Sequence, residues 1–369
     1  MDPRELRADT PALTDCTYLN FGASGPSPRR VVAACQSFQA YHAYESPAEE
    51  GMYGAAVDCY DEVRPAIADL LGCAPESVAL TQSTTDGINR VASALDWQRG
   101  DVVVRTDLEH SAGILPWQRR RDRYGVEIRS VPCPDGRLDV DAYATAVADA
   151  KLVCLSALTW THGTYLDVAR AVEIAHEAGA LVLVDAVQMP GQTAMDVTEW
   201  GADFVAAAGH KWLLGPWGAG FVYVRPEVIG ELEPDRIGYR SAAEKTDDDY
   251  ELHADARRLE VGTVSPAPYA GLQTAIETWA DVGYETVESR IAALTERLKD
   301  GIPADRLYSP REFESGLVTF RADDPEALVE RAADAGVMIR SLPKPEGAVR
   351  ASIHAVNTEA DVEALLDLL

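Results

Sequence analysis

From residue 46 onward, the chain alternates between short apolar runs and longer amphipathic stretches. The apolar runs are continuous and rich in β-branched residues, which is typical of strands buried on both faces. They predict strands at 78–81, 102–105, 152–155, 181–185, 204–208 and 220–225. The amphipathic stretches predict helices at 54–72, 86–96, 139–150 and 167–179. Strands that alternate with helices indicate βα units, and so a mostly parallel sheet with helices on both faces.

A polar, acid-rich segment at 233–257 interrupts this pattern, and we expect it to lie on the surface. After it we expect helices at 265–281 and 283–300, strands near 316–321, 336–340 and 349–354, and helices near 324–335 and 358–369. The pattern therefore predicts a large domain over residues 21–262 and a smaller C-terminal α/β domain over 263–369. The N-terminal segment, 1–20, is expected to pack on the small domain.

The charge balance argues against nucleic acid or an anionic membrane as a partner. The 369 residues include 33 lysines and arginines against 60 aspartates and glutamates, a formal net charge of −27, and such a charge repels polyanions. No apolar run approaches the length of a membrane span, and the first residues lack a secretory signal pattern. We therefore expect a soluble, cytoplasmic protein.

Lysine is scarce in this chain, which has five: Lys151, Lys211, Lys245, Lys299 and Lys344. An excess of carboxylates with few lysines favours adaptation to high salt, where screening weakens self-repulsion. An ordinary acidic protein is the alternative. The six cysteines form no C-x-x-C pair, so we expect reduced thiols rather than disulfides or a metal site.

Candidate chemistry gathers where four predicted strands end, which is where open α/β sheets bind ligands. One strand ends in Asp185, a second runs into G-H-K with Lys211, and two others run into Q-S-T-T-D (82–86) and D-L-E-H (107–110). Taken singly, most of these are explained as helix caps or ordinary polar residues. The lysine is not, because a charge beside a buried strand is costly unless it is paired or modified.

Taken together, the four features meet the requirements of pyridoxal 5'-phosphate. This cofactor needs a lysine amine for a Schiff base and an acid opposite the pyridine nitrogen, which keeps the ring able to accept electrons. Its phosphate needs hydroxyls and N–H groups at the start of a helix. A flat side chain that stacks on the ring completes such a site. The chain offers a candidate for each need.

Three motifs are specific in combination: D-A-V-Q at 185–188, G-H-K-W-L-L-G-P-W-G-A-G at 209–220 and E-V-G-T at 260–263. With them, the chain resembles fold-type I pyridoxal-phosphate enzymes of the class V aminotransferase and cysteine desulfurase (selenocysteine lyase-like) family. The resemblance runs in order from Y-L-N-F-G-A-S-G-P at 18–26 to R-A-S-I-H-A-V-N-T at 350–358. It implies the large and small α/β domains expected above.

The resemblance also assigns roles to the cofactor side of the site. Lys211 resembles the Schiff-base lysine, and Asp185 resembles the acid that pairs with the pyridinium. Gln188 would contact the ring oxygen, and His110 resembles the histidine that stacks on the ring. The phosphate would be held by a set of three residues, namely Thr84, Thr85 and His210.

Further roles concern the substrate and the partner subunit. Arg350 resembles the arginine that clamps the substrate carboxylate, a bidentate task suited to guanidinium, with a surface ion pair as the alternative. Asn20 and Trp160 are assigned to the substrate side as well, and for Trp160 a packing role is equally open. In relatives the residue that matches Thr263 comes from the partner subunit, which implies a homodimer with shared active sites.

The sequence departs from the desulfurase pattern at three places. Ala208 stands where relatives commonly have a serine that donates to the phosphate, so one hydroxyl donor is lost. Trp160 stands where relatives often have an asparagine, and either Trp160 or nearby His162 can shape the substrate pocket. The loop 339–350 contains no cysteine, whereas desulfurases take sulfur from the substrate on a cysteine of that loop. The usual desulfurase route is therefore disfavoured.

The function expected from this resemblance is Schiff-base exchange at Lys211 with an α-amino acid, followed by transamination or elimination. Lys211 would then act as the base that removes the α-proton. One alternative is a cysteine desulfurase or selenocysteine lyase-type activity without a loop persulfide. Another is a non-catalytic scaffold on the same fold, against which Lys211, Asp185, Gln188 and His110 together argue. Neither the substrate side chain nor the choice among reactions follows from the sequence.

Overall fold

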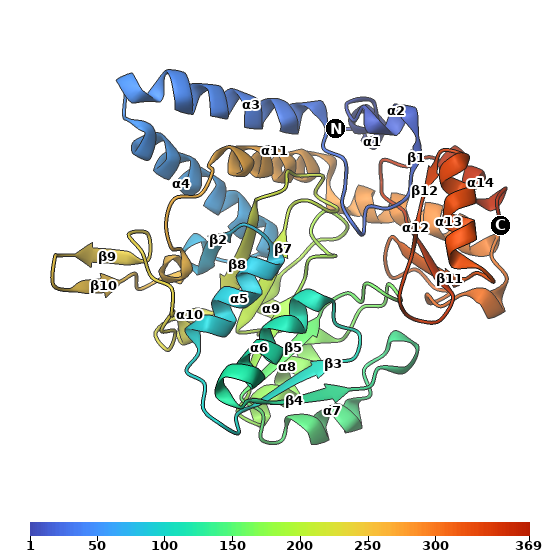
Figure 1. Cartoon of the computed structure of the whole chain (residues 1–369). Helices are drawn as coiled ribbons and strands as arrows, with labels where there is room; N and C mark the ends of the chain where they lie inside the picture. The colour runs from blue at the N-terminus through green and yellow to red at the C-terminus, as the bar shows by residue number, and fades with distance from the viewer.

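A computed structural model describes all residues from 1 to 369. A seven-stranded sheet in the order β2–β8–β7–β6–β5–β3–β4 forms its centre (Figure 1). Its strands are β2 (Val78–Thr81), β3 (Val102–Thr106), β4 (Glu127–Val131), β5 (Leu152–Ser156), β6 (Leu181–Asp185), β7 (Phe204–Ala208) and β8 (Gly220–Val224). Only β8 runs antiparallel to its neighbours. The predicted mostly parallel sheet is therefore confirmed, and the carboxyl ends of the other six strands share one edge.

Both faces of this sheet are buried, because successive side chains of each strand enter two different cores. In β6, Val182 and Val184 belong to one core, whereas Leu183 belongs to the other. The first core is covered by α4 (Met52–Leu71), α7 (Val140–Val147), α8 (Val168–Glu177) and α11 (Ala267–Val282). The second is covered by α5 (Thr84–Ala94) and α6 (Leu115–Tyr124). Short helices α9 (Val197–Trp200) and α10 (Pro226–Ile229) follow β6 and β8.

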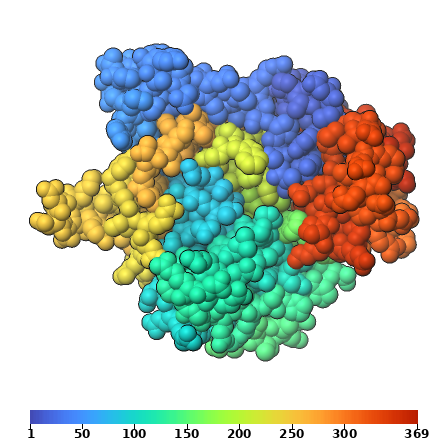
Figure 2. Space-filling view, viewed as in Figure 1, coloured from blue at the N-terminus to red at the C-terminus, as the bar shows by residue number.

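Among the elements that the sequence pattern did not predict are two long helices, α3 (Arg29–Tyr44) and α6, and the edge strand β4. Six short 3-10 turns complete the chain, namely Ser46–Ala48, Pro75–Ser77, Ser111–Gly113, Pro134–Gly136, Ala256–Leu259 and Ala304–Arg306. The predicted surface excursion contains a hairpin of β9 (Ala242–Lys245) and β10 (Tyr250–Leu252), which projects from the body of the protein (Figures 1 and 2). No helix has the length and apolar character that crossing a bilayer requires.

The C-terminal part builds a second, smaller sheet in the order β11–β14–β13, all antiparallel. These strands are β11 (Leu317–Arg321), β13 (Arg340–Ser341) and β14 (Ala348–Ser352), accompanied by α12 (Tyr284–Asp300), α13 (Pro325–Asp334) and α14 (Glu359–Leu366). Leu298, Phe320 and Val349 belong to its separate core. In the β13–β14 ladder, Arg340 stands directly opposite Arg350, a register that matters for the site.

The N-terminal segment connects the two parts. After α1 (Pro3–Ala8) and α2 (Ala12–Asp15), strand β1 (Thr17–Tyr18) pairs in parallel with β12 (Val337–Met338). Arg7 forms an ion pair with Asp361 at 2.9 Å. Helix α11 lies against α3 and α4 rather than against the small sheet (Figure 1). The boundaries at residues 20 and 262 therefore stay a prediction.

Candidate functional site

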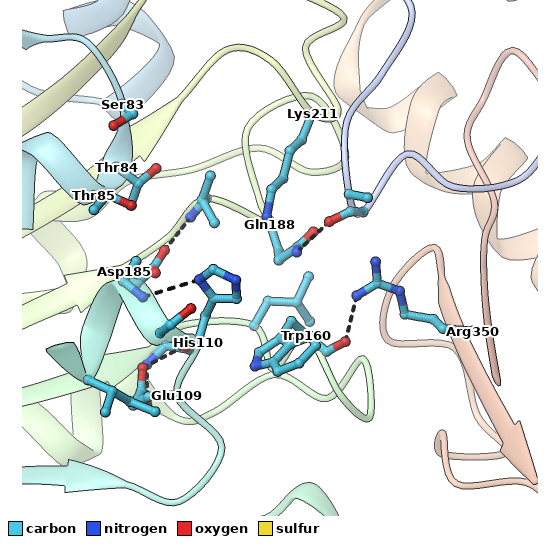
Figure 3. Close-up of a pocket in the computed structure, with 18 of the residues that line it drawn as sticks. Ser83, Thr84, Thr85, Glu109, His110, Trp160, Asp185, Gln188, Lys211 and Arg350 are labelled. Carbon is cyan, nitrogen blue, oxygen red and sulfur yellow. Dashed lines mark hydrogen bonds between the residues drawn. The ribbon is translucent and has the colours of Figure 1, made fainter. Parts of the chain in front are cut away.

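A cavity of about 640 Å³ opens at the carboxyl ends of β3, β5 and β6, between the large sheet and strands β13 and β14 (Figure 3). The folding of the chain brings nine of the eleven predicted site residues to its lining. These are Thr84, Thr85, His110, Trp160, Asp185, Gln188, His210, Lys211 and Arg350. Asn20 and Thr263 lie outside the lining.

Lys211 lies in the loop that follows β7, and residues 22–25 fix this loop from the other side. The N–H of Gly25 donates to the carbonyl oxygen of His210 at 2.8 Å. A Cβ on Gly25 would come within 2.2 Å of the carbonyl oxygen of Lys211, so only glycine fits there. Desolvation inside the cavity lowers the pKa of the lysine to about 8. A usable fraction of free amine is therefore present near neutral pH.

Asp185 ends β6, and its side chain, with 4% of the residue exposed, reaches the cavity from the sheet edge. Its Oδ1 accepts from the N–H of Val187 at 3.0 Å. Burial raises the pKa of Asp185, while that hydrogen bond and Lys211 lower it. Gln188 donates from Nε2 to the carbonyl of Gly22 at 2.9 Å and accepts from the Trp212 indole at 2.8 Å. One amide N–H of Gln188 is left for a ligand.

The start of α5 presents an anion site to the cavity. Ser83 caps the helix, its hydroxyl accepting from the N–H of Asp86 at 3.1 Å. The Thr84 hydroxyl is buried and has no hydrogen-bond partner, although it lines the cavity with Thr85. Desolvation lowers the pKa of His210 to about 4, so this ring is neutral near pH 7. An orphaned hydroxyl at a helix N-terminus fits a phosphate group.

His110 and Trp160 form an aromatic wall (Figure 3). The two rings meet edge to face, with centroids 5.5 Å apart. Nδ1 of His110 accepts from the N–H of Ala112 at 3.2 Å, and the Trp160 indole donates to the carbonyl of Leu108 at 2.9 Å. Both rings are therefore fixed by the loop that follows β3. Burial and the nearby cations lower the pKa of His110, which keeps it neutral.

Arg350 enters the cavity from β14, opposite the α5 end (Figure 3). Only 1% of its surface is exposed. Its Nη1 donates to the carbonyl of Trp160 at 2.7 Å, whereas Nε and Nη2 are buried without any partner. The hydroxyl of Ser352 and Oδ1 of Asn20 are also unpartnered, and these two residues form a backbone bridge. Unsatisfied donors on a buried guanidinium require an anion.

Several lining residues were not predicted as site residues, among them Glu109, Arg340 and Lys344. Glu109 is buried and accepts from the hydroxyls of Thr106 and Ser156 at 2.6 and 2.7 Å. Burial raises its pKa to about 7, partly offset by these hydrogen bonds. Its position next to His110 in D-L-E-H was the only signal in the sequence. Arg340 and Lys344 offered none, because their chemistry depends on the fold around them.

Thr263 is exposed and its hydroxyl lies 2.8 Å from that of Tyr239. None of the six cysteines, all free thiols, lines the cavity; three of them are buried and three are half-buried. No cluster of three or more His, Cys, Asp or Glu side chains is arranged to hold a metal ion. The cavity therefore combines an amine, a carboxylate, a helix N-terminus and an unpaired guanidinium, and these groups fit pyridoxal phosphate with an amino acid.

Comparison with known proteins agrees with this chemistry. Residues 17–365 match the family described as Aminotransferase class-V. A protein from Methanothermobacter thermautotrophicus named as a probable cysteine desulfurase is 32% identical, over 100% of this chain and 98% of its own length.

Three similar solved structures, of two proteins, bear on the site. The apo structure of a cysteine desulfurase from Thermococcus onnurineus superposes with a TM-score of 0.91 at 29% identity, covering 100% of this chain and 97% of that one. A lysine-to-alanine mutant of C-DES, with glycine covalently linked to its PLP cofactor, gives a TM-score of 0.91 at 27% identity and 98% coverage of both chains. Another structure of C-DES, named as a cystine C-S lyase, contains its reaction product cysteine persulfide.

Proposed function

The chain belongs to the aminotransferase class-V family of pyridoxal-phosphate enzymes, and from that premise we propose that it is a carbon–sulfur lyase. Its substrate would be cysteine or an S-substituted cysteine. In the proposed reaction, R–S–CH2–CH(NH3+)–COO− and water give R–SH, pyruvate and ammonium, so that no oxidant or reductant is needed. The observation that carries the proposal is a cavity that holds Lys211 and Arg350 but no thiol.

Sulfur transfer to the protein would require a thiolate at the substrate. The loop 339–350, which would carry it, has no cysteine. Burial raises the pKa of Cys133 to about 12 and raises that of Cys154 well above its usual value, so neither supplies a thiolate at neutral pH. Sulfur would then leave on the substrate's own fragment. The cystine C-S lyase activity named for C-DES supports this.

Each residue of the cavity would have its own role in the proposed reaction. Bound pyridoxal phosphate supplies the electron sink that makes the α-proton acidic. Arg350 would bind the α-carboxylate through Nε and Nη2, its two free donors. Nζ of Lys211, with a pKa of about 8, would take the α-proton and return a proton to the leaving sulfur. Asp185 would hold the pyridinium, while His110 and Trp160 exclude water from one side.

Product analysis tests the proposal. The holoenzyme is incubated with L-cysteine and, separately, with L-cystine, and pyruvate, ammonium, alanine and reduced sulfur are quantified. We expect pyruvate and ammonium in equal amounts, and persistent visible absorbance of the cofactor. Alanine with sulfur left on the protein would mean a desulfurase and would overturn the proposal. Conversion of the cofactor to its amine form would mean transamination and would overturn it as well.

We also propose a homodimer with shared active sites. Thr263 does not reach the cavity of its own chain, which is what a residue serving the partner's site would do. Large apolar side chains stand exposed on and beside α3 and α4, including Tyr44 (82% exposed), Tyr53 (69%) and Trp217 (74%), and such exposure is typical of an interface. Sedimentation of the holoenzyme at micromolar concentration should give twice the chain mass of 39.9 kDa, and a monomer would refute the proposal.

Finally, we propose a reducing compartment such as the cytoplasm, because six free thiols without a disulfide suit one.

A further inference from the structure

The cavity holds more cationic side chains than the proposed reaction uses. The cationic side chains of its lining are Lys211, Arg340, Lys344 and Arg350, against two carboxyl groups, Asp185 and Glu109. None of the four cations forms an ion pair with a carboxylate of the chain, as the full set of ion pairs shows. In a chain with a net charge of −27, unpaired cations in one cavity require an explanation.

The small sheet places two of these cations, Arg340 and Arg350, side by side. Arg340 in β13 and Arg350 in β14 are directly opposite each other in an antiparallel ladder, so their side chains leave the same face. Both line the cavity. Like charges opposite each other destabilise a sheet unless an anion lies between or beyond them. The only hydrogen bond of the Arg340 side chain is a long one, 3.4 Å, from Nε to the carbonyl of Ser341.

The cofactor and the α-carboxylate do not account for Arg340. A phosphate would lie at the start of α5, on the side of the cavity opposite Arg350 (Figure 3). A substrate α-carboxylate would satisfy the two free donors of Arg350. Lys344 adds to the excess, since it lines the same cavity and its Nζ reaches only the backbone carbonyl of Asp107. A second anion on the substrate would balance what remains.

We propose that Arg340, together with Lys344 in the same cavity lining, forms a second anion subsite that selects amino acids carrying a negative charge on the side chain or leaving fragment. The proposal rests on the proposed function, and within it the preferred substrate is an S-substituted cysteine whose substituent bears a carboxylate or similar acid. Arg350 takes the α-carboxylate and Arg340 takes the second anion. The rigid β13–β14 register sets the spacing between the two anions.

Binding of unreactive acids to the holoenzyme tests this without any turnover. Succinate carries two carboxylates and butyrate carries one on the same number of carbons, and calorimetry at constant ionic strength measures both. We expect succinate to bind at least about tenfold more tightly, since one charge-assisted contact distinguishes them. Arg340→Gln should abolish this difference and leave butyrate binding unchanged. Arg321→Gln in β11 of the same sheet, on an exposed side chain outside the cavity, is the matched control and should keep the difference.

Two outcomes of the binding experiment overturn the subsite. If Arg340→Gln weakens the binding of butyrate and of succinate equally, Arg340 and Arg350 bind one and the same carboxylate. If succinate and butyrate bind equally to the unaltered protein, there is no second subsite. Turnover of S-carboxymethyl-L-cysteine against its neutral amide, S-carbamoylmethyl-L-cysteine, separates this proposal from the proposed function. Pyruvate from both at equal kcat/KM supports the lyase and refutes the subsite, whereas tight succinate binding without pyruvate supports the subsite and refutes the lyase.

Discussion

At the scale of single residues, the site consists of charged side chains that are buried away from water, and some of them have no partner in the chain. Lys211 shows this most directly. Desolvation is the main cause of its lowered pKa, and Arg350 and Arg340 act in the same direction, while Asp185 acts against them. The lysine is therefore prepared to react as an amine before any ligand arrives.

This pKa predicts how the apoprotein takes up its cofactor. Only the free amine condenses with an aldehyde, so the rate of uptake should rise about tenfold per pH unit up to pH 8 and then level off. Stopped-flow measurement of the visible absorbance at pH 6 to 10 checks this. A rate that keeps rising beyond pH 10 would show an ordinary lysine and contradict the site described above.

Substituting the lysine gives a sharper test of its role. Lys211→Ala should remove the visible absorbance of the lysine-bound cofactor and lower kcat by at least about a thousandfold, because both the covalent anchor and the base are lost. Lys245→Ala, on the exposed hairpin strand β9, changes the same residue type and should behave as the unaltered protein. A Lys211→Ala protein that is still yellow and active would rule out Lys211 as the Schiff-base lysine and the base.

The sequence could predict those site residues that stand in motifs, and it missed those that only the fold brings in. Lys211, Asp185 and Gln188 belong to short specific motifs and all line the cavity. Arg340 and Lys344 lie in the stretch I-R-S-L-P-K-P, where the sequence offered only the absence of a cysteine. Their meaning depends on a strand register with Arg350, which no local pattern encodes.

At the scale of elements, burial decides which helices and strands the sequence pattern can predict. Strand β5 is buried along its length and β6 is buried from Val182 onward, so their continuous apolar runs are obvious. Helix α3 has a single buried residue, Val31, and α6 contains Q-R-R-R-D-R, so neither shows an apolar stripe. Strand β4, at the sheet edge, alternates little and is mostly accessible. These three were missed for that reason.

A buried ion-pair cluster joins α4 and β2 to the 3-10 turn Ala256–Leu259. Glu260, with 4% of its side chain exposed, accepts from Arg64 at 2.8 Å and from the N–H of Leu80 at 2.9 Å. It also pairs with Arg240. Burial alone would raise the pKa of Glu260, but the two arginines and the hydrogen bonds lower it overall. The glutamate therefore stays ionised where three elements meet.

Removing the Glu260 carboxylate should destabilise the protein where α4, β2 and the 3-10 turn meet. Glu260→Gln removes the only buried countercharge of Arg64, leaving it the exposed Asp61 alone, and should lower the free energy of unfolding by about 3–5 kcal/mol. Asp61→Asn is the matched control, because Asp61 is 58% exposed and 4.0 Å from the same arginine, and it should cost less than about 1 kcal/mol. Urea unfolding at pH 7 measures both. Equal effects of the two substitutions would contradict the cluster's role.

At the scale of the whole molecule, the net charge of −27 acts on every part of the fold at once. Repulsion among surface carboxylates opposes the compact state, and dissolved salt screens it. The hairpin of β9 and β10 concentrates this charge in three successive exposed aspartates, Asp247, Asp248 and Asp249. The predicted adaptation to high salt can be tested there.

The thermal unfolding midpoint should rise by about 5 °C or more between 0.2 and 2 M KCl. Replacing Asp247, Asp248 and Asp249 together by asparagine should raise the midpoint at 0.2 M KCl and leave it unchanged at 2 M, because screening has already removed the repulsion there. Differential scanning calorimetry measures both. A midpoint that does not depend on salt would show an ordinary acidic protein.

The pairing of β1 with β12 has a consequence for how the protein is made. Thr17 finds its neighbour at Val337, and Arg7 finds its countercharge at Asp361. Arg7 and Thr17 are therefore synthesised long before their partners Asp361 and Val337, and the large sheet between them can form in the meantime. The small sheet, which supplies Arg340 and Arg350, is completed at the same late moment. A stalled or prematurely terminated chain would thus hold Lys211 and Asp185 but lack the arginine side of the site.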